Sequence, residues 1–297
     1  MDPVINNNKK VLNKIRNSIV AFFKTITANK KALIGFIILL FFILIALFGP
    51  IVFPYDQSTD WANRYLGPSK EHWLGTDELG RDVFRQLVYG SRDVLSIAFL
   101  TGIFTVLIGT ILGMVSGFFG GWVDKIIQAI TTLFLTIPSF PILLLLAQLF
   151  TIEDSLTFAL VLSVWNWAGL CRAIRAQILS LKERDFIQIC TVMNMSKAHI
   201  IFKELMPNIS SYILINFIAI VKHAITSSIG IMTLGLAAFE PTNWGAMLHR
   251  ARMQGLMNPN VVRFMMAPLG AIILFQTGSI LFAYGLDEVL NPRLKVN

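Results

Sequence analysis

The sequence has little charge for its length. Only 14% of its 297 residues are charged, whereas a soluble domain carries about 25%. At the same time 55% of the residues are hydrophobic, and they fall in long uninterrupted blocks. A chain of this kind cannot coat a water-exposed globule, so the composition predicts that the lipid bilayer is its solvent.

Cysteine and histidine are too sparse to suggest a disulfide framework or a metal site. Cys171 and Cys190 are the only cysteines, without a C-x-x-C spacing, and the four histidines are scattered. The sequence also lacks a G-x-x-x-x-G-K-[ST] loop, which cradles nucleotide phosphates. We therefore expect no catalytic residues, no metal and no cofactor in this chain.

Positive charge is in excess, with a formal net charge of +8. Such an excess can indicate nucleic-acid binding. Here, however, the Lys and Arg residues flank apolar blocks, which is the distribution that the positive-inside bias of membrane proteins produces. We expect the bilayer, and no nucleic acid, as a partner.

The apolar blocks are long enough to cross a membrane. Residues 32–53 carry no charge over 22 positions, which is about 33 Å of helix against a hydrocarbon core of about 30 Å. Five further blocks follow, at 94–119, 126–150, 156–170, 209–236 and 264–286. The sequence predicts an all-α integral membrane protein with about six transmembrane helices.

Two of these blocks contain proline or glycine residues that affect how their helices bend or pack. Pro138 and Pro141 interrupt the third block and should kink it. Gly109, Gly113 and Gly117 in the second block form a repeated small-xxx-small pattern, which favours close helix packing. Ordinary intramembrane glycine is the alternative for any one of them.

The orientation follows from the basic residues between the blocks. With the N-terminus inside, the inner segments carry 16 Lys and Arg and the outer segments carry 8, which predicts that both termini are cytoplasmic. We expect a cytoplasmic N-terminal segment (1–31), one membrane domain (32–286) and a cytoplasmic C-terminal tail (287–297). Within the membrane domain, 54–93 and 235–263 are outside and 172–208 is a cytoplasmic loop.

The cytoplasmic loop contains signals for two short helices. The first begins at Arg184 and is broken after Met193, because Asn194 tolerates the left-handed conformation that ends helices. Ser196 is a suitable N-cap for a second helix, 197–205, which Pro207 should end. Two such helices at an angle would form a knob that docks into a soluble partner; a merely solvated loop is the alternative.

The same loop resembles the coupling loop of ATP-binding cassette (ABC) importer permeases. That loop reads Glu-Ala-Ala, three residues, Gly and, further on, Leu-Pro; this sequence has Gln188-Ile189-Cys190, then Asn194, then Met206-Pro207. The spacing between these positions is the same as in the family, but the Glu, both Ala and the Gly are replaced. The resemblance implies that an ATPase contacts this loop, for which we select Arg184, Asp185, Gln188, Ile189, Cys190, Asn194, Ser196, Lys197, Lys203 and Pro207.

The first outside segment contains a compact polar motif. Asp82 is placed to cap a short helix, 83–89, that Gly90 can end. A catalytic role for its aspartates lacks a neighbouring nucleophile or metal ligand, so we expect a structural, hydrogen-bonded turn. Its members are Gly75, Thr76, Asp77, Gly80, Arg81 and Asp82.

The string Leu-Gly-Thr-Asp-x-x-Gly-Arg-Asp at 74–82 is similar to the permeases of the dipeptide, oligopeptide and nickel uptake family, and to the shorter of their two permeases in particular. Other family-like strings are Asn-Lys-Lys-Ala-Leu-Ile-Gly at 29–35, Pro-Tyr-Asp at 54–56, Leu-Gly-Leu at 234–236 and Asn-Pro-Arg at 291–293. Together they cover nearly the whole chain in the correct order.

This resemblance implies a type I ABC importer permease fold and a place in the cell membrane. It also implies a homologous second permease, two ATPases that hold ATP and Mg, and an extracytoplasmic binding protein. Peptide is the first substrate expected, with nickel or another chelated metal as the alternative. An autonomous secondary transporter is the alternative from another class, although the inverted repeats that it predicts are not visible.

Lys222 and His223 lie near the middle of the fifth block. A charge at that depth is costly unless it faces water, protein or an anion. Lys222 therefore faces either the translocation pathway, where it would favour a substrate carboxylate, or the partner permease. Trp73 and Trp244 are expected to anchor at the membrane interface.

Overall fold

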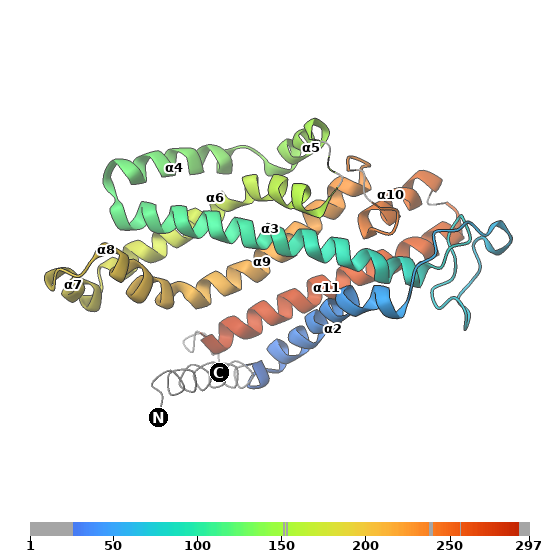
Figure 1. The fold of residues 1–297 in the computed structure, drawn as a ribbon, viewed down its shortest axis with the longest axis horizontal. Coiled ribbons are helices and arrows are strands. Elements are labelled where there is room, and N and C mark those ends of the chain that lie inside the picture. The colour runs from blue at the N-terminus through green and yellow to red at the C-terminus, as the bar shows by residue number, and fades with distance from the viewer. Residues whose placement is uncertain (1–25, 151, 153, 238–239, 256, 291–297) are drawn as a thin grey trace, which may run out of the picture. The chain divides into compact units, whose positions relative to one another are not determined.

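The computed structural model describes residues 26–150, 152, 154–237, 240–255 and 257–290. Most of the predicted N-terminal segment and the Asn-Pro-Arg string at 291–293 therefore lie outside the described residues. The described chain is mainly helical, apart from a long irregular segment between α2 (Lys30–Val52) and α3 (Val83–Phe119) (Figure 1). It divides into two compact units, one made of the chain up to Phe41 and from Leu274 onward, the other of Phe42–Ile273.

Most elements follow one another with short connections, but about 30 residues, with a single 3-10 turn, separate α2 from α3. They are α2 (Lys30–Val52), η1 (Trp61–Asn63), α3 (Val83–Phe119), α4 (Gly121–Thr136), α5 (Ser139–Leu149), α6 (Ser155–Lys182), α7 (Asp185–Val192), α8 (Lys197–His199), η2 (Ile200–Leu205), α9 (Met206–Thr233), α10 (Trp244–Gln254) and α11 (Pro259–Leu290). Within the described residues, five helices are long and apolar enough to cross a membrane, or six if the bent pair α4 and α5 counts as one span. The predicted number of about six is confirmed.

The bend between α4 and α5 occurs where the prolines predicted it. The two helices meet at 89°. Ile137 has an extended backbone (φ −83°, ψ 130°), as expected for the residue before a proline, and Pro138 leads into α5. The effect is larger than a kink, because α4 ends and a new helix begins.

α3 is the central helix of the larger unit and packs most extensively along α6. The glycine pattern allows this: a Cβ on Gly113 would lie 2.6 Å from the Cys171 carbonyl oxygen, and one on Gly117 would lie 2.8 Å from the Ile178 side chain. Gly109 faces Trp167 and Leu170 in the same way. The predicted close packing is confirmed, and the partner helix is α6.

In the smaller unit the first part of α2 pairs with the last part of α11. Gly35 approaches the backbone of Phe282, and Gly285 approaches that of Ala32. Asn29 Nδ2 donates a hydrogen bond to Glu288 Oε2 at 2.9 Å. Small residues again permit close approach of two apolar helices.

α3 begins 11 residues earlier than the predicted span at 94–119, because the separate helix predicted at 83–89 does not end at Gly90. Gly90 is buried inside the helix, and a Cβ there would collide with the Thr242 carbonyl. The glycine therefore serves to admit a neighbouring backbone and does not terminate the helix. Asp82 caps the long helix as predicted, accepting from Arg85 N at 2.8 Å.

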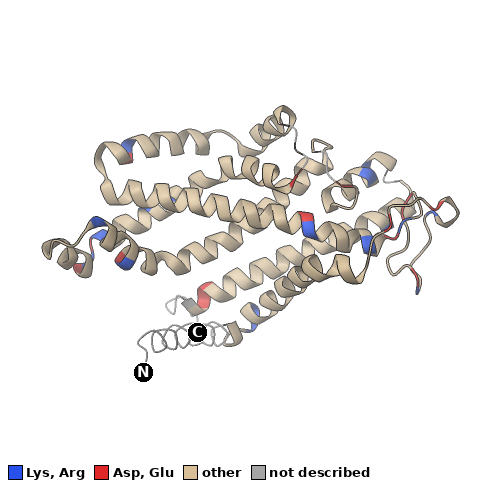
Figure 2. Ribbon diagram, viewed as in Figure 1, with Lys and Arg blue, Asp and Glu red and all other residues tan. Residues whose placement is uncertain are grey.

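α6 also runs further than its apolar block, to Lys182. On the extended part of this helix, Arg175 forms a two-pronged ion pair with Asp124 of α4, with both N–O distances 2.6 Å. Charged residues otherwise gather in the outside segment and around α7 and α8, while α3, α6 and α9 are uncharged for most of their length (Figure 2).

Candidate functional site

The motif at residues 75–82, in the segment that is predicted to be outside, folds as a turn stabilised by its own side chains. Gly75 and Gly80 both have φ of +77°, the left-handed region that glycine adopts at little cost. Asp77 Oδ1 accepts from the backbone N–H groups of Leu79 and Arg81, each at 2.9 Å. The Arg81 guanidinium forms an ion pair with Asp77, with 2.8 Å between Nη2 and Oδ2. The predicted local cluster is present.

Two other motif residues tie the turn to its surroundings. The Thr76 hydroxyl donates to the Asn63 carbonyl at 2.5 Å and accepts from Leu66 N at 2.8 Å. Asp82, besides capping α3, lies 2.8 Å from His72 Nδ1. The motif is therefore a structural centre for the whole segment between α2 and α3.

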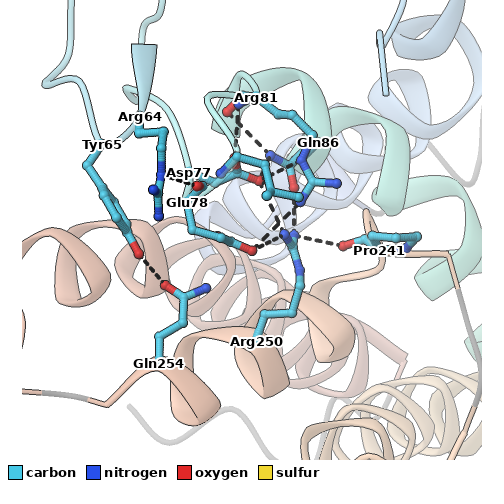
Figure 3. Close-up of polar contacts among 10 residues, drawn as sticks. Arg64, Tyr65, Asp77, Glu78, Arg81, Gln86, Pro241, Arg250 and Gln254 are labelled. Atoms are coloured by element: carbon cyan, nitrogen blue, oxygen red, sulfur yellow. Dashed lines mark hydrogen bonds and ion pairs between the residues drawn. The ribbon is translucent and has the colours of Figure 1, made fainter. Parts of the chain in front are cut away.

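A residue far along the chain completes this centre. Arg250 of α10 reaches Asp77 Oδ2 at 3.2 Å, Glu78 Oε1 at 2.8 Å and Gln86 Oε1 at 2.7 Å (Figure 3). Arg250 also donates to the Pro241 carbonyl at 3.0 Å. We call the five side chains Asp77, Glu78, Arg81, Gln86 and Arg250 the outside lock.

The outside lock is largely buried and balanced in charge. The side chains of Asp77 and Arg81 are 0% and 8% exposed, and those of Glu78 and Arg250 are 15% and 20% exposed. Two carboxylates therefore face two guanidinium groups in a mostly buried cluster. Burial by itself raises the pKa of Asp77, but the hydrogen bonds and charge of Arg81 outweigh burial and hold that pKa below its usual value of 3.8. Asp77 is therefore an anion at neutral pH.

No sequence pattern points to Arg250 or Gln86, since the contacts that join Arg250 to this cluster span up to 173 residues. The prediction that Trp244 is an interface anchor is wrong. Trp244 is 1% exposed and donates its indole N–H to the Leu87 carbonyl at 2.9 Å. The Trp244 ring is therefore buried against α3 and does not lie at a surface. Trp73, by contrast, is 57% exposed.

The loop that is predicted to be cytoplasmic forms a compact projection at the end of the larger unit opposite the segment between α2 and α3 (Figure 1). We call residues 184–205 the cytoplasmic knob, after the predicted orientation. α7 turns Ile187 and Cys190 inward, where they share an apolar cluster with Ile174 and Ile178 of α6 and with Leu205 of η2. The knob is thus packed against both long helices that lead into and out of it.

The predicted end of α7 at Asn194 is confirmed. Asn194 has φ of +52°, its N–H donates to the Thr191 carbonyl at 3.0 Å, and Met195 N donates to the Cys190 carbonyl at 3.1 Å. This is the Schellman arrangement, in which one left-handed residue satisfies the last carbonyls of a helix. Ser196 then caps α8, accepting from His199 N at 3.2 Å.

The predicted end of the second helix at Pro207 is wrong. α8 continues through the π-helical stretch η2 into α9, so that Lys197–Thr233 is one helix. Wider π-type hydrogen bonding, in which Met206 N donates to the Ile201 carbonyl, makes room for the proline ring in the first turn of α9. Asn208 Nδ2 donates to the Glu204 carbonyl at 2.7 Å, which satisfies an acceptor near the proline.

The outer surface of the knob carries apolar and cationic side chains. Ile189 is 56% exposed, Met193 64% and Val192 87%. Arg184, Asp185, Gln188 and Lys203 are also exposed, and the ammonium of Lys197 lies 5.4 Å from the centre of the Phe119 ring. A groove of about 460 Å³ runs between α7 and the last turn of α3.

Lys222 and His223 lie on α9, well inside the long helix. His223 is exposed and lines a cavity between α6, α9 and the α4–α5 bend, whereas Lys222 is half-buried and does not line it. In the part of the chain that the structure describes, no three His, Cys, Asp or Glu side chains come together as metal ligands.

Two family models match the chain. The model described as "Binding-protein-dependent transport system inner membrane component" matches residues 109–296, more than half of the chain. The chain belongs to this family. A second model, "N-terminal TM domain of oligopeptide transport permease C", matches residues 21–68. Family membership confirms the expected type I importer permease fold and identifies a multi-pass inner membrane protein.

Several curated members of the family are similar over nearly their whole length. The dipeptide transport permease DppC of Alkalihalophilus pseudofirmus is 35% identical over 276 residues, covering 92% of this chain and 89% of that protein. The oligopeptide transport permease OppC of Bacillus subtilis is 30% identical, with 97% and 92% covered. The glutathione transport permease GsiD of Pectobacterium atrosepticum is 32% identical, with 92% and 91% covered. The alternative of an autonomous secondary transporter receives no support from these matches.

Proposed function

We propose that this chain is one of the two permeases of an ATP-driven peptide importer, with both termini in the cytoplasm. The proposal rests on its family and on relatives that are named for dipeptide, oligopeptide and glutathione transport. None of these three names concerns nickel, so the metal alternative is not favoured. A homologous permease would supply the other half of the pathway, and an extracytoplasmic binding protein would deliver the peptide.

ATP and Mg would be held by two separate ATPase subunits that act on the cytoplasmic knob. The observation that carries this is the contrast between the two faces of α7. Its inner face is fixed to α6 and η2 by Ile187 and Cys190, while its outer face presents Val192, Met193 and Ile189 to a partner. Exposed apolar residues rimmed by cations are typical of a docking surface.

Such a knob can transmit a displacement. A push on α7 moves Ile187 and Cys190, and close-packed interiors transmit strain because they have few voids to absorb it. The same cluster contains residues of α6 and η2, and η2 is continuous with α9. Movement at the knob would therefore reach α9, where Lys222 and His223 lie, and change access to the pathway.

The test compares complete transporter with permease alone in proteoliposomes, using a labelled tripeptide. ATP-dependent uptake is expected only when both permeases, the ATPases and the binding protein are present. Val192→Asp should lower uptake and ATPase cross-linking about tenfold or more, because it places a charge in an apolar contact. Trp61→Asp, at an exposed position of the outside segment, is the control and should leave cross-linking unchanged.

Two results would contradict the proposal. Uptake by this chain alone without nucleotide would indicate an autonomous transporter. Full cross-linking of the Val192→Asp complex would show that the ATPase contacts some other surface.

A further inference from the structure

The groove between α7 and the last turn of α3 has a volume of about 460 Å³, within the usual range of about 300–1,000 Å³ for small-molecule sites. Its apolar walls are formed by Phe118 and Phe119 at the end of α3 and by Ile187 and Val192 of α7. Of the apolar residues proposed above to contact the ATPase, only Val192 lines this groove. The ATPase surface therefore does not account for it.

Two lysines place positive charge in the groove. Lys197, the first residue of α8, holds its ammonium 5.4 Å from the centre of the Phe119 ring. Lys182, at the end of α6, donates from Nζ to the carbonyls of Phe118 at 2.9 Å and Gly117 at 3.5 Å, which offsets the negative end of the α3 dipole. An ammonium has three N–H groups, so a donor and the charge remain available to a ligand.

The groove supplies no negative charge of its own. None of its described lining residues carries a carboxylate, and the ion pairs of the described chain include neither Lys182 nor Lys197. Its neutral polar groups are Gln188 and Thr191, which each donate one hydrogen bond to a backbone carbonyl. Their side-chain oxygens can still accept. The groove is therefore complementary to an anionic group that also carries hydroxyls.

The groove lies where a membrane span ends. Phe119 is the last residue of α3, which is long and apolar enough to cross a membrane. Phe119 and the nearby Trp122 are both exposed, and the Lys125 ammonium lies 4.9 Å from the centre of the Trp122 ring. Exposed aromatic rings beside lysines are typical of the boundary between membrane and water. Basic pockets between spans at the cytoplasmic boundary are suited to lipid headgroups.

We propose that this groove binds the headgroup of an anionic phospholipid. The ammonium groups of Lys182 and Lys197 would hold the phosphate, and headgroup hydroxyls would donate to Gln188 and Thr191. The acyl chains would extend along the exposed ring of Phe119 into the bilayer. The lipid would thus join the end of α3 to the cytoplasmic knob. The proposed orientation of the chain decides only which leaflet supplies the lipid.

A photoreactive lipid tests this in the complete transporter. Phosphatidylglycerol with a diazirine on the acyl chain, close to the glycerol, is added to phosphatidylcholine vesicles that contain the complex. Cross-linked peptides are identified by mass spectrometry. Labelling of residues 118–119 and 187–197 should exceed that by phosphatidylcholine with the same diazirine about tenfold or more, because two lysines attract the anionic headgroup. Equal labelling by the two lipids overturns the inference.

Substitutions separate the groove from general attraction by a basic surface. Lys197→Gln should lower labelling about fivefold, whereas Lys197→Arg, which keeps the charge, should retain most of it. Thr191→Trp keeps both lysines but fills the groove from an exposed position, and should lower labelling as much as Lys197→Gln.

Lys125→Gln is the matched control, because Lys125 is also exposed beside an aromatic ring and does not line the groove. It should change labelling about twofold or less. Equal losses in Lys125→Gln and Lys197→Gln would mean unspecific attraction, and full labelling of Thr191→Trp would place the lipid elsewhere; both contradict the inference.

The same assay distinguishes two other occupants. Competition by soluble glycerol phosphate as strong as that by phosphatidylglycerol would identify a soluble ligand. Labelling that appears only without the ATPases would show that an ATPase fills the groove. Either result overturns the inference. Labelling is measured without peptide or nucleotide, so a failure of import contradicts the proposed function and leaves the lipid result unaffected.

Discussion

The outside lock and the cytoplasmic knob sit at opposite ends of the larger unit and are stabilised in opposite ways. The lock joins residues distant in sequence through buried charges, with Asp77 fully buried between Arg81 and Arg250. The knob is built from neighbours in sequence, through the Asn194 turn and the Ser196 cap. Its inner face is apolar and its outer face remains exposed.

The two kinds of stabilisation suit the two ends to different roles. A buried charge network has one satisfactory geometry, because a displaced partner leaves an uncompensated charge. It keeps the segment between α2 and α3 fixed to α10. The turn and cap of the knob are local, and its second helix continues into α9, so a displacement of α7 can pass to α9 without breaking distant contacts.

The largest effect is expected from breaking the lock at Arg250. Arg250→Met would leave Asp77 and Glu78 short of a partner, and loss of one member of a buried pair costs about 3–5 kcal/mol. The apparent melting temperature of the purified chain in detergent should fall, and proteolysis within residues 54–82 should increase. Arg252→Met, at an exposed position on the same helix, should change stability by about 0.5 kcal/mol or less.

Acid should destabilise the outside lock and leave the turn and cap of the cytoplasmic knob unchanged. Because the pKa of Asp77 is lower in the folded chain than its usual 3.8, its stabilisation is complete above that value and is lost as pH falls through the folded pKa. Below about pH 4 the opening equilibrium of residues 54–82 should rise by up to about tenfold per pH unit. Hydrogen exchange of both regions in one sample measures this.

In the same acid titration the knob serves as the internal control. Its turn and cap use backbone groups and the Ser196 hydroxyl, which do not titrate in this range. Equal loosening of residues 190–196, which include the turn and the cap and contain no Asp, Glu or His, would mean that acid weakens the whole chain and that the lock is not the sensitive element.

The smallest effect concerns the turn of the knob. Asn194→Val should destabilise the knob by about 1 kcal/mol, because a β-branched residue is strained at a φ of +52°. Asn194→Gly should be neutral or slightly stabilising. Hydrogen exchange at α7 distinguishes the two, and equal exchange in both variants would show that the left-handed turn does not limit the stability of the knob.

Local features were predictable from the sequence because their causes lie within a few residues. The spans follow from uncharged blocks, the break at Pro138 from proline chemistry, and the Asn194 turn and Ser196 cap from side chains that satisfy nearby backbone groups. Two of the wrong predictions, at Gly90 and Pro207, concern residues that usually end helices but have a different use here. Thr242 occupies the space beside Gly90, and π-type bonding absorbs Pro207.

The helical fold, the membrane location and the resemblance to an importer permease can all be read from the linear chain, since they depend on hydrophobic length, charge placement and short motifs. The contact of Arg250 with the Asp77 cluster, and the cavity shared by Trp165, Asn216 and His223, are visible only once the helices are packed together. These contacts join positions many residues apart. Their geometry depends on how α3, α6, α9 and α10 pack, which no short stretch of sequence encodes.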